Sequence, residues 1–353
     1  MKKNILFACY KQANSNDVIF IAQRNNEPIG LTLNELLQKT GFVIYPFDKE
    51  SKDNLPYFIF PDIQGKINDI DIHEIESLPS YNHKSYDETY SMPKAEYEAK
   101  LEPLIHLLKS DDPIQKVVFS RIAHVDKPDH FNESELFHTL TEKYTEAFCY
   151  ILNIPNEGVW IGASPETLLN VEDNKAHTVA LAGTQKRKDQ EDINCIKWSH
   201  KDQEEQEYVT SFVQDILHQY NINDYTQSDP YTIATAKVVH LKTSFSFPAD
   251  NIKDQLGDFI LSLHPTPAVG GVPQDKAIQK IKEVEPHNRE YYSGFLGPVN
   301  INNSSHLYVN LRCMKVSNKL LSLFIGGGIT SQSIVENEWE ETCLKAQTLL
   351  SVL

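Results

Sequence analysis

The sequence of 353 residues lacks the features of membrane-spanning and nucleic-acid-binding proteins. No run reaches the roughly 18–20 apolar residues of a transmembrane helix. The apolar residues after Lys3 end at Tyr10, short of the roughly 7–15 residues in a signal-peptide core. Basic side chains number 33 against 49 acidic ones, which gives a formal net charge of −16. This balance argues against binding to nucleic acid or to an anionic membrane.

The five cysteines form neither a disulfide framework nor a zinc-binding pattern. Cys9, Cys149, Cys195, Cys313 and Cys343 are odd in number and scattered, and the sequence has no CxxC pair. This pattern is typical of a reducing compartment, so we expect a cytoplasmic protein. The nucleotide-binding motifs GxGxxG and GxxxxGK[ST] are also absent. With 40% hydrophobic and 23% charged residues, the chain has the composition of a globular protein.

Strand-like segments dominate the secondary structure that the sequence predicts. They are rich in Val, Ile, Phe and Tyr and have turn residues at their borders. Few of them have a helix before the next strand, which favours mostly antiparallel sheets and an α+β fold class. The predicted strands are 116–121, 148–154, 158–163, 177–182, 236–247, 307–316 and 320–325.

Three helices follow from the spacing of the apolar residues. The first comes after Pro93, and Pro103 is expected to kink or split it. The second covers about 201–220 with Ser199 as its N-cap, and the third covers about 337–350. A stretch over residues 78–93, crowded with Ser, Tyr, Asn, His and Asp, is the best candidate for a linker.

Carboxylates stand at the starts of the second and third helices, where they continue or flank an apolar stripe. Such groups are costly to bury unless they are paired or bind a cation. An all-oxygen set suits Mg²⁺ better than zinc or copper. The alternative is an ordinary acidic first turn favoured by the helix dipole, and both interpretations remain open. The residues concerned are Asp202, Glu205, Glu338 and Glu341, with Lys345 one turn further on.

Four other features have both a chemical and a structural interpretation. The glycines at 326–328 follow a strand and either form a tight turn or present bare amides to an anion. Glu166 ends a predicted strand in GASPE, which is not the nucleophile motif GxSxG. His264 lies in a loop rich in Pro and Gly, where a lone histidine is usually structural. Arg312 lies in an apolar segment and either binds an anion or forms a buried ion pair.

Taken together and in this order, these segments resemble the chorismate-utilising enzymes, a family of isochorismate, anthranilate, aminodeoxychorismate and salicylate synthases. The resemblance covers about residue 93 to the C-terminus. It implies one α+β domain with large, mostly antiparallel sheets at the core and helices outside. Residues 1–90 are then an abbreviated N-terminal part of the same fold, and 93–353 are the chorismate-binding catalytic region. The matching motifs are KVVFSR (116–121), GASPE (162–166), LAGT (181–184), KDQEEQEYV (201–209), LHPTPAVGG (263–271), EPHNREYYSG (285–294), VNLRC (309–313), FIGGGI (324–329) and NEWEETCLK (337–345).

Individual positions indicate the subtype by the same resemblance. Lys116 stands where the water-using isochorismate and salicylate synthases carry a lysine base, whereas anthranilate synthases have glutamine there. Ala182 replaces the nucleophilic lysine of aminodeoxychorismate synthases. The sequence departs from the family at His200, usually acidic, and at Gln206, usually histidine. The resemblance favours an isochorismate synthase without a glutamine amidotransferase partner. The alternatives are a salicylate synthase, an anthranilate-type subunit and a silent chorismate-binding regulator.

The resemblance also assigns expected roles. Water would add at ring carbon two of chorismate as the hydroxyl at carbon four leaves, with Lys116 as a partly neutral base and Glu166 as a protonated acid. Mg²⁺ would be held by Glu205 and Glu341, with Asp202 and Glu338 behind them. The substrate would be bound by His264, Arg312, the amides of Gly327 and Gly328, Lys345, and the segment Ala182, Gly183 and Thr184. The product would serve menaquinone or catechol siderophore synthesis, and the protein would be a monomer or a weak homo-oligomer.

Overall fold

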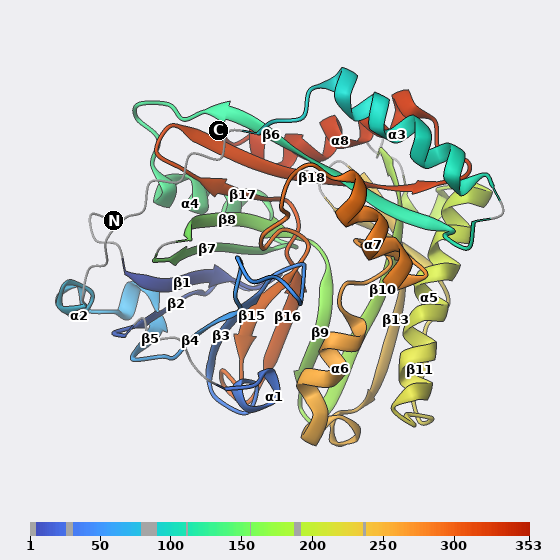
Figure 1. The fold of residues 1–353 in the computed structure, drawn as a ribbon. Helices are drawn as coiled ribbons and strands as arrows, with labels where there is room; N and C mark the ends of the chain where they lie inside the picture. The colour runs from blue at the N-terminus through green and yellow to red at the C-terminus, as the bar shows by residue number, and fades with distance from the viewer. Residues whose placement is uncertain are drawn as a thin grey trace.

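Two large antiparallel sheets face each other and form the body of the protein (Figure 1). The computed structural model describes residues 5–25, 31–78, 90–110, 112–155, 157–186, 192–235 and 238–353. Every strand pair among these residues is antiparallel. The first sheet has the order β14 (Gly271–Val272), β6 (Lys116–Asp126), β18 (Leu320–Thr330), β17 (Cys313–Val316), β8 (Gly158–Ser164), β7 (Phe148–Ile154), β1 (Leu6–Lys11), β2 (Val18–Gln23), β5 (Ile63–Lys66).

The second sheet carries the other half of the core. Its order is β11 (Thr226–Gln227), β13 (Val238–Pro248), β10 (Lys175–Lys186), β9 (Thr167–Glu172), β16 (Ser305–Val309), β15 (Phe295–Val299), β3 (Gly41–Tyr45), β4 (Tyr57–Ile59), with β12 (Tyr231–Thr235) also beside β13. The strands before residue 70 are thus divided between the two sheets. The predicted α+β class with mostly antiparallel sheets is confirmed.

The alternation of side chains along the strands separates two layers of core. In β1, Tyr10 belongs to the large cluster shared by both sheets, whereas Cys9 belongs to a second cluster on the other face. Aromatic rings fill the centre, and those of Phe148 and Tyr308 stack with centroids 4.2 Å apart across the two sheets. Each buried aromatic ring of this kind contributes a large apolar area to folding.

Helices cover the outer faces of both sheets. Helices α4 (Glu133–Lys143) and α8 (Val335–Leu350) pack on the first sheet, and α3 (Lys94–Leu108) and α7 (Gln274–Val284) pack against β6. Helix α5 (His200–Gln219) packs against β10 and β13. The shorter helices are α1 (Leu33–Leu36), α2 (Ile72–Ser77), α6 (Leu256–Leu263), η1 (Ile67–Asp69), η2 (Ile193–Cys195), η3 (Ala249–Asn251) and η4 (Lys253–Gln255). Within the described ranges, no helix has both the length and the apolar character needed to cross a membrane.

Three local predictions are wrong. Pro103 does not split helix α3, which continues through it; Pro103 lies on the exposed side, where water can solvate the carbonyl left without a partner. The predicted strand 307–316 is two strands in different sheets, and Arg312 between them has a φ of +49°. The glycines at 326–328 form no turn, because β18 continues through them to Thr330. Most of the candidate linker, residues 79–89, lies outside the described residues.

Candidate active site

A cavity of about 130 Å³ lies where β6 and β18 of the first sheet approach β10, β13, α5 and α8. It gathers most of the side chains that the sequence marked as candidates. The predicted residues that line it are Glu166, Ala182, Gly183, Asp202, Glu205, Arg312, Gly328, Glu341 and Lys345. Thr184 belongs to β10, but its side chain lies outside the described part of the structure.

Lys116 does not itself line this cavity, but it forms an ion pair with a residue that does. It is the first residue of β6, its side chain has no solvent exposure, and its Nζ lies 2.7 Å from Glu205 Oε1 on α5. Gly328 on the neighbouring strand leaves room for the pair. A Cβ at this glycine would stand 2.9 Å from Glu205 Oε1 and 3.0 Å from Lys116 Cε. The lysine is therefore fixed by a carboxylate that itself faces the cavity, as burial of a charge requires.

Glu166 is a buried acid that lines the cavity. It follows the end of β8 at Ser164, and only 5% of its surface is exposed. Thr266 Oγ1 donates a hydrogen bond to Glu166 Oε1 at 3.4 Å. Burial raises the pKa of Glu166 to about 7, although the positive charges of Lys116, Arg312 and Lys345 act in the other direction. A substantial fraction is therefore protonated near neutral pH, as a general acid requires.

Backbone amides and two cations form an anion-binding side of the cavity. Lys345 Nζ donates to Gly326 O at 3.0 Å and lies 2.6 Å from Glu341 Oε1. Arg312 lines the same cavity between β16 and β17. Tyr292 and the carboxyl groups of Glu341 and Glu166 face this guanidinium, while burial lowers its pKa.

The strand geometry selects which glycine amides face the cavity. The N–H and C=O of one strand residue point to the same side, and successive residues alternate. Because Gly326 O faces Lys345, the N–H groups of Gly326 and Gly328 point away from β6, while Gly327 pairs with Phe119. Strand β17 pairs with β18 only as far as Phe324. The structure therefore presents Gly326 and Gly328 to the cavity in place of the predicted pair Gly327 and Gly328.

The four predicted metal ligands are not equivalent. Glu205 and Glu341 line the cavity from two different helices. Asp202 Oδ2 instead accepts hydrogen bonds from Ser199 Oγ at 2.6 Å and Gln185 Nε2 at 3.2 Å, so it caps α5. Glu338 is 2% exposed, and its Oε2 lies near Gly327, which does not line the cavity.

The donor set nevertheless fits Mg²⁺. Among the described residues, no three His, Cys, Asp or Glu side chains form a ready-made metal site. Mg²⁺ retains several water molecules and usually takes only one or two protein carboxylates together with substrate oxygens. The carboxylates of Glu205 and Glu341 supply such oxygens. Each of them is also balanced by a lysine, Lys116 or Lys345.

His264 does not line the cavity. Its Nε2 lies 3.1 Å from both Pro46 O and Phe47 O, and its ring packs edge-on against Phe295. Burial lowers its pKa to about 4, so the imidazole is neutral and joins its loop to the segment after β3. The prediction that it meets the substrate is therefore not matched by this geometry. From the same loop, Ala268 and Val269 line the cavity, and Thr266 contacts Glu166.

Two polar side chains that line the cavity, those of His240 and Tyr292, were missed in the sequence. His240 of β13 has its Nδ1 2.9 Å from Gly183 O, and burial, aided by the charge of Arg312, lowers its pKa to about 4. Tyr292 stacks on Phe324 with centroids 5.7 Å apart, and its hydroxyl lies beside Gly326. Tyr292 was part of a recognised motif. His240 had no local signal except its place in a β-branched strand.

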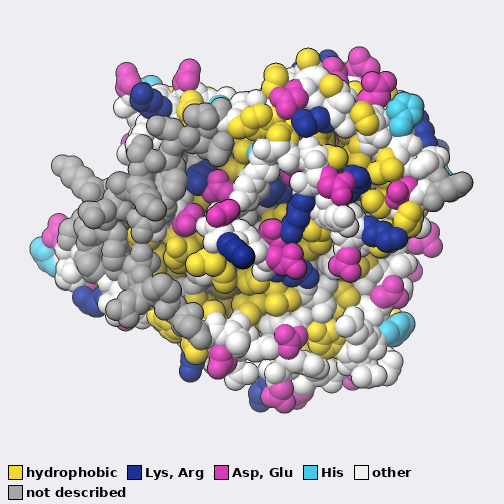
Figure 2. Space-filling view, in the orientation of Figure 1, with side chains coloured by type: hydrophobic (Ala, Val, Ile, Leu, Met, Phe, Trp, Pro, Cys, Tyr) yellow, Lys and Arg dark blue, Asp and Glu magenta, His cyan; other side chains and the backbone are white. Residues whose placement is uncertain are grey.

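On the face shown in Figure 2, basic and acidic side chains are interspersed in the middle, with hydrophobic side chains around them. The excess of negative charge therefore does not form one continuous field over this face.

Comparison with known proteins gives the family. The chain matches the family model described as chorismate binding enzyme over residues 50–353. It is 32% identical to isochorismate synthase EntC of Escherichia coli K12 over 250 residues, which cover 69% of this chain and 64% of the relative. It is 26% identical to the vibriobactin-specific isochorismate synthase of Vibrio cholerae over 318 residues, 88% of this chain and 78% of the relative.

A solved structure shares the fold. MenF of Escherichia coli, described as a menaquinone-specific isochorismate synthase, matches with a TM-score of 0.79 at 21% identity, over 100% of this chain and 90% of that one. The chain thus spans a little under two thirds of the length of EntC and almost the whole of the solved structure. The family match and the arrangement of the cavity agree with the motifs of the sequence: the chain belongs to the chorismate-binding enzymes.

Proposed function

We propose that this protein is an isochorismate synthase, which isomerises chorismate by adding water at ring carbon two while the hydroxyl leaves carbon four. The observation that carries the proposal is that a buried acid, Glu166, lines the cavity, while a buried lysine, Lys116, forms an ion pair with Glu205, which lines the same cavity. Two relatives bear the name isochorismate synthase. The reaction needs a base for the attacking water and an acid for the departing hydroxyl, because neither reacts readily alone.

Lys116 is proposed as the base and Glu166 as the acid. The pKa of about 7 at Glu166 lets it donate a proton near neutral pH and take one back afterwards. Lys116 has to be neutral to act as a base, whereas its Nζ donates a hydrogen bond to Glu205 Oε1 in the structure. Because this ion pair favours the protonated lysine, Lys116 has to leave it before taking a proton from water. Lys116 takes one proton from the attacking water and Glu166 gives one to the departing hydroxyl, so the protons balance. The enzyme returns to its starting state when Lys116 releases a proton and Glu166 takes one up.

The remaining groups bind the substrate. Chorismate carries two carboxylates, and the cavity offers Arg312, Lys345 and the amides of Gly326 and Gly328 on one side. Fixed cations and amides of this kind are strong carboxylate ligands when solvent is excluded. We assign the enolpyruvyl carboxylate to Arg312 and these amides.

Mg²⁺ is proposed as the cofactor, held by Glu205 and Glu341. When bound, it would neutralise the ring carboxylate and so allow a dianion to approach two acidic side chains. Helices α5 and α8 position Glu205 and Glu341 at the cavity, and the ion pair with Lys345 orients the carboxylate of Glu341.

The pathway and cellular setting complete the proposal. All five cysteines are free thiols, as in a reducing compartment, which supports a cytoplasmic enzyme. Relatives include a vibriobactin-specific and a menaquinone-specific isochorismate synthase, so we propose that the product serves menaquinone or siderophore synthesis. No amidotransferase partner is expected, since Lys116 stands where ammonia-using members carry glutamine.

The test is product analysis after incubation of the pure protein with chorismate and Mg²⁺. We expect isochorismate, which does not aromatise. Fluorescent salicylate would identify a salicylate synthase, and anthranilate formed with ammonia would identify the third subtype. Unchanged chorismate in the presence of tight binding would mean a silent regulator.

The Lys116→Gln variant is the matched control for this test. It should lose conversion by at least about 10²-fold while still binding chorismate in the presence of Mg²⁺. Loss of both conversion and binding would assign Lys116 a structural role only.

A further inference from the structure

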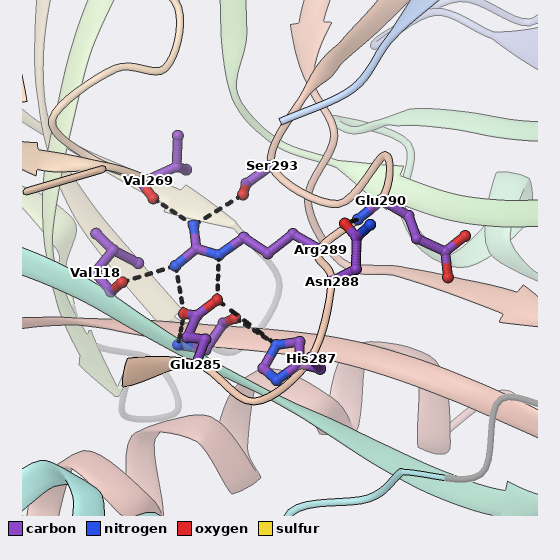
Figure 3. Close-up of polar contacts among 9 residues, drawn as sticks. Val118, Val269, Glu285, His287, Asn288, Arg289, Glu290 and Ser293 are labelled. Atoms are coloured by element: carbon purple, nitrogen blue, oxygen red, sulfur yellow. Dashed lines mark hydrogen bonds and ion pairs between the residues drawn. The ribbon is translucent and has the colours of Figure 1, made fainter. Parts of the chain in front are cut away.

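Arg289 is the centre of a buried polar cluster that includes two residues of the cavity wall (Figure 3). Only 3% of its surface is exposed. Its Nε and one terminal nitrogen donate to the two oxygens of Glu285 at 2.8 and 2.6 Å. The same nitrogen donates to Val118 O at 2.7 Å, and the other donates to Val269 O at 2.8 Å and Ser293 Oγ at 3.2 Å. The fork-shaped guanidinium therefore joins four separate groups at fixed angles.

Two of these partners belong to different walls of the cavity. Val118 on β6 and Val269 on the loop before β14 both line it, whereas Arg289 does not. The two walls are also joined directly, because Val118 N donates to Gly270 O. Glu285 reinforces the arrangement, since its Oε1 accepts a hydrogen bond from Ser120 N at 2.7 Å.

Each wall carries a group that the proposed reaction needs. Lys116 lies two residues before Val118, on the same face of β6. Thr266 lies three residues before Val269 and donates to Glu166 Oε1. A shift of this loop relative to β6 would therefore move Thr266, which contacts the acid Glu166, relative to the base Lys116.

We propose that Arg289, together with Glu285, is a positioning residue that holds the base-bearing strand and the acid-contacting loop in register. This inference rests on the proposed function, because the relative position of the two walls matters for catalysis only if Lys116 and Glu166 act as base and acid. Arg289 acts through Val118 and Val269 and does not touch the substrate. The guanidinium carbon of Arg289 lies 4.3 Å from the centroid of the Phe47 ring. This contact holds the guanidinium in the plane from which it reaches the carbonyls of Val118 and Val269.

The test uses Arg289→Lys, which keeps the charge but lacks the planar fork. Hydrogen–deuterium exchange should accelerate in peptides covering 116–121 and 264–272 and remain unchanged in those covering 149–154. The kcat for chorismate should fall at least about tenfold with KM changed less than about threefold, because substrate ligands are untouched while the reacting geometry is lost. Glu285→Gln weakens the acceptor of the Arg289 hydrogen bonds, so it should accelerate exchange in the same two peptides.

Lys11→Met is the control for general destabilisation. Lys11 is also a buried cation, whose Nζ donates to Thr141 O at 2.9 Å, and it does not line the cavity. We expect it to lower Tm without changing kcat per active site. If Arg289→Lys behaved like this control, or left exchange in both walls unchanged, the positioning role would be overturned. If the wild type failed to convert chorismate, the proposed function would fall, and the exchange data alone would decide whether Arg289 holds the two walls.

Discussion

Gly328 leaves space for the Lys116–Glu205 ion pair. Adding one methyl group at this position tests whether the ion pair needs that space. In Gly328→Ala the new Cβ would lie 2.9 Å from Glu205 Oε1 and 3.0 Å from Lys116 Cε, so the pair has to move. We expect kcat/KM for chorismate to fall at least about tenfold. Steady-state kinetics give the value.

Gly327→Ala is the matched control, because the Cβ there would meet its nearest atoms, Glu338 Oε2 and Glu341 Oε1, only at 3.6 and 3.8 Å. Neither glycine has a positive φ, so alanine causes no backbone strain at either position. Equal losses in the two variants would show that the space around the pair is not what matters.

The titration of Glu166 should also make the free energy of unfolding depend on pH. Its folded-state pKa is raised to about 7 from 4.5, so the folded protein retains a proton that the unfolded chain releases. The free energy of unfolding should therefore fall as pH rises from about 4.5 to 7, by an amount on the order of 3 kcal/mol.

Glu166→Gln lacks this titration, so urea denaturation of both proteins at pH 4.5 and pH 7.5 isolates it. The wild type should lose stability relative to the variant across this window. Parallel pH dependences would mean that Glu166 is ionised in the folded protein, and the role of proton donor would then fail.

At the residue scale, the motifs predicted most of the cavity because they list side-chain types in a known order. They could not predict how the loop of His264 is oriented. That orientation is set by the carbonyls of Pro46 and Phe47, which lie more than 200 residues earlier. His240 was missed because its place depends on the pairing of β13 with β10.

At the element scale, the start of α5 shows a carboxylate used for folding. Ser199 and Asp202 form a reciprocal capping box, as the sequence predicts. Ser199→Ala removes one side of it and should lower the free energy of unfolding by about 1 kcal/mol. Chemical denaturation measures this loss.

The same variant should keep its Mg²⁺ affinity within about threefold, whereas Glu205→Gln should weaken it at least about tenfold, because Glu205 is a proposed ligand while the carboxylate of Asp202 is held in the capping box. Calorimetric titration with Mg²⁺ distinguishes the two. If Ser199→Ala weakened Mg²⁺ binding as much as Glu205→Gln, the capped Asp202 would have to be counted among the ligands.

Element types were easier to predict than element ends. The run 307–316 is mostly apolar, and nothing local shows that the chain leaves one sheet at Val309 and enters the other at Cys313. The three glycines of β18 resemble a turn by composition. They remain in a strand because β6 continues opposite them as far as Lys116.

At the scale of the whole molecule, the N-terminal strands are internal to the sheets although the family match begins at residue 50. Strand β1 lies between β7 and β2, and β3 lies between β15 and β4. Tyr10 and Phe42 are almost fully buried, and both rings pack near Phe148. Without these strands, β7 and β15 become exposed edges beside an open core.

A chain consisting of residues 50–353 alone should therefore fail to fold cooperatively. We expect aggregation in size-exclusion chromatography and loss of the near-ultraviolet circular dichroism signal. Co-expression with residues 1–49 should restore soluble protein. A monomeric 50–353 chain with cooperative unfolding would show that the two sheets do not depend on their N-terminal strands.

The α+β class followed from strand-rich segments with few intervening helices, and the structure bears it out. The order of strands did not follow, because it depends on pairings between segments such as β1 and β7, which are over 100 residues apart. Pairings at this separation leave no periodic signal in the sequence.

The central claim is that the protein adds solvent water to chorismate, and isotope labelling tests it most directly. Incubation of the wild type with chorismate and Mg²⁺ in ¹⁸O-labelled water, followed by mass spectrometry, should give isochorismate with one heavy oxygen, at ring carbon two. Isochorismate without label would mean that the hydroxyl migrates within the substrate. The absence of isochorismate would contradict the proposed function altogether.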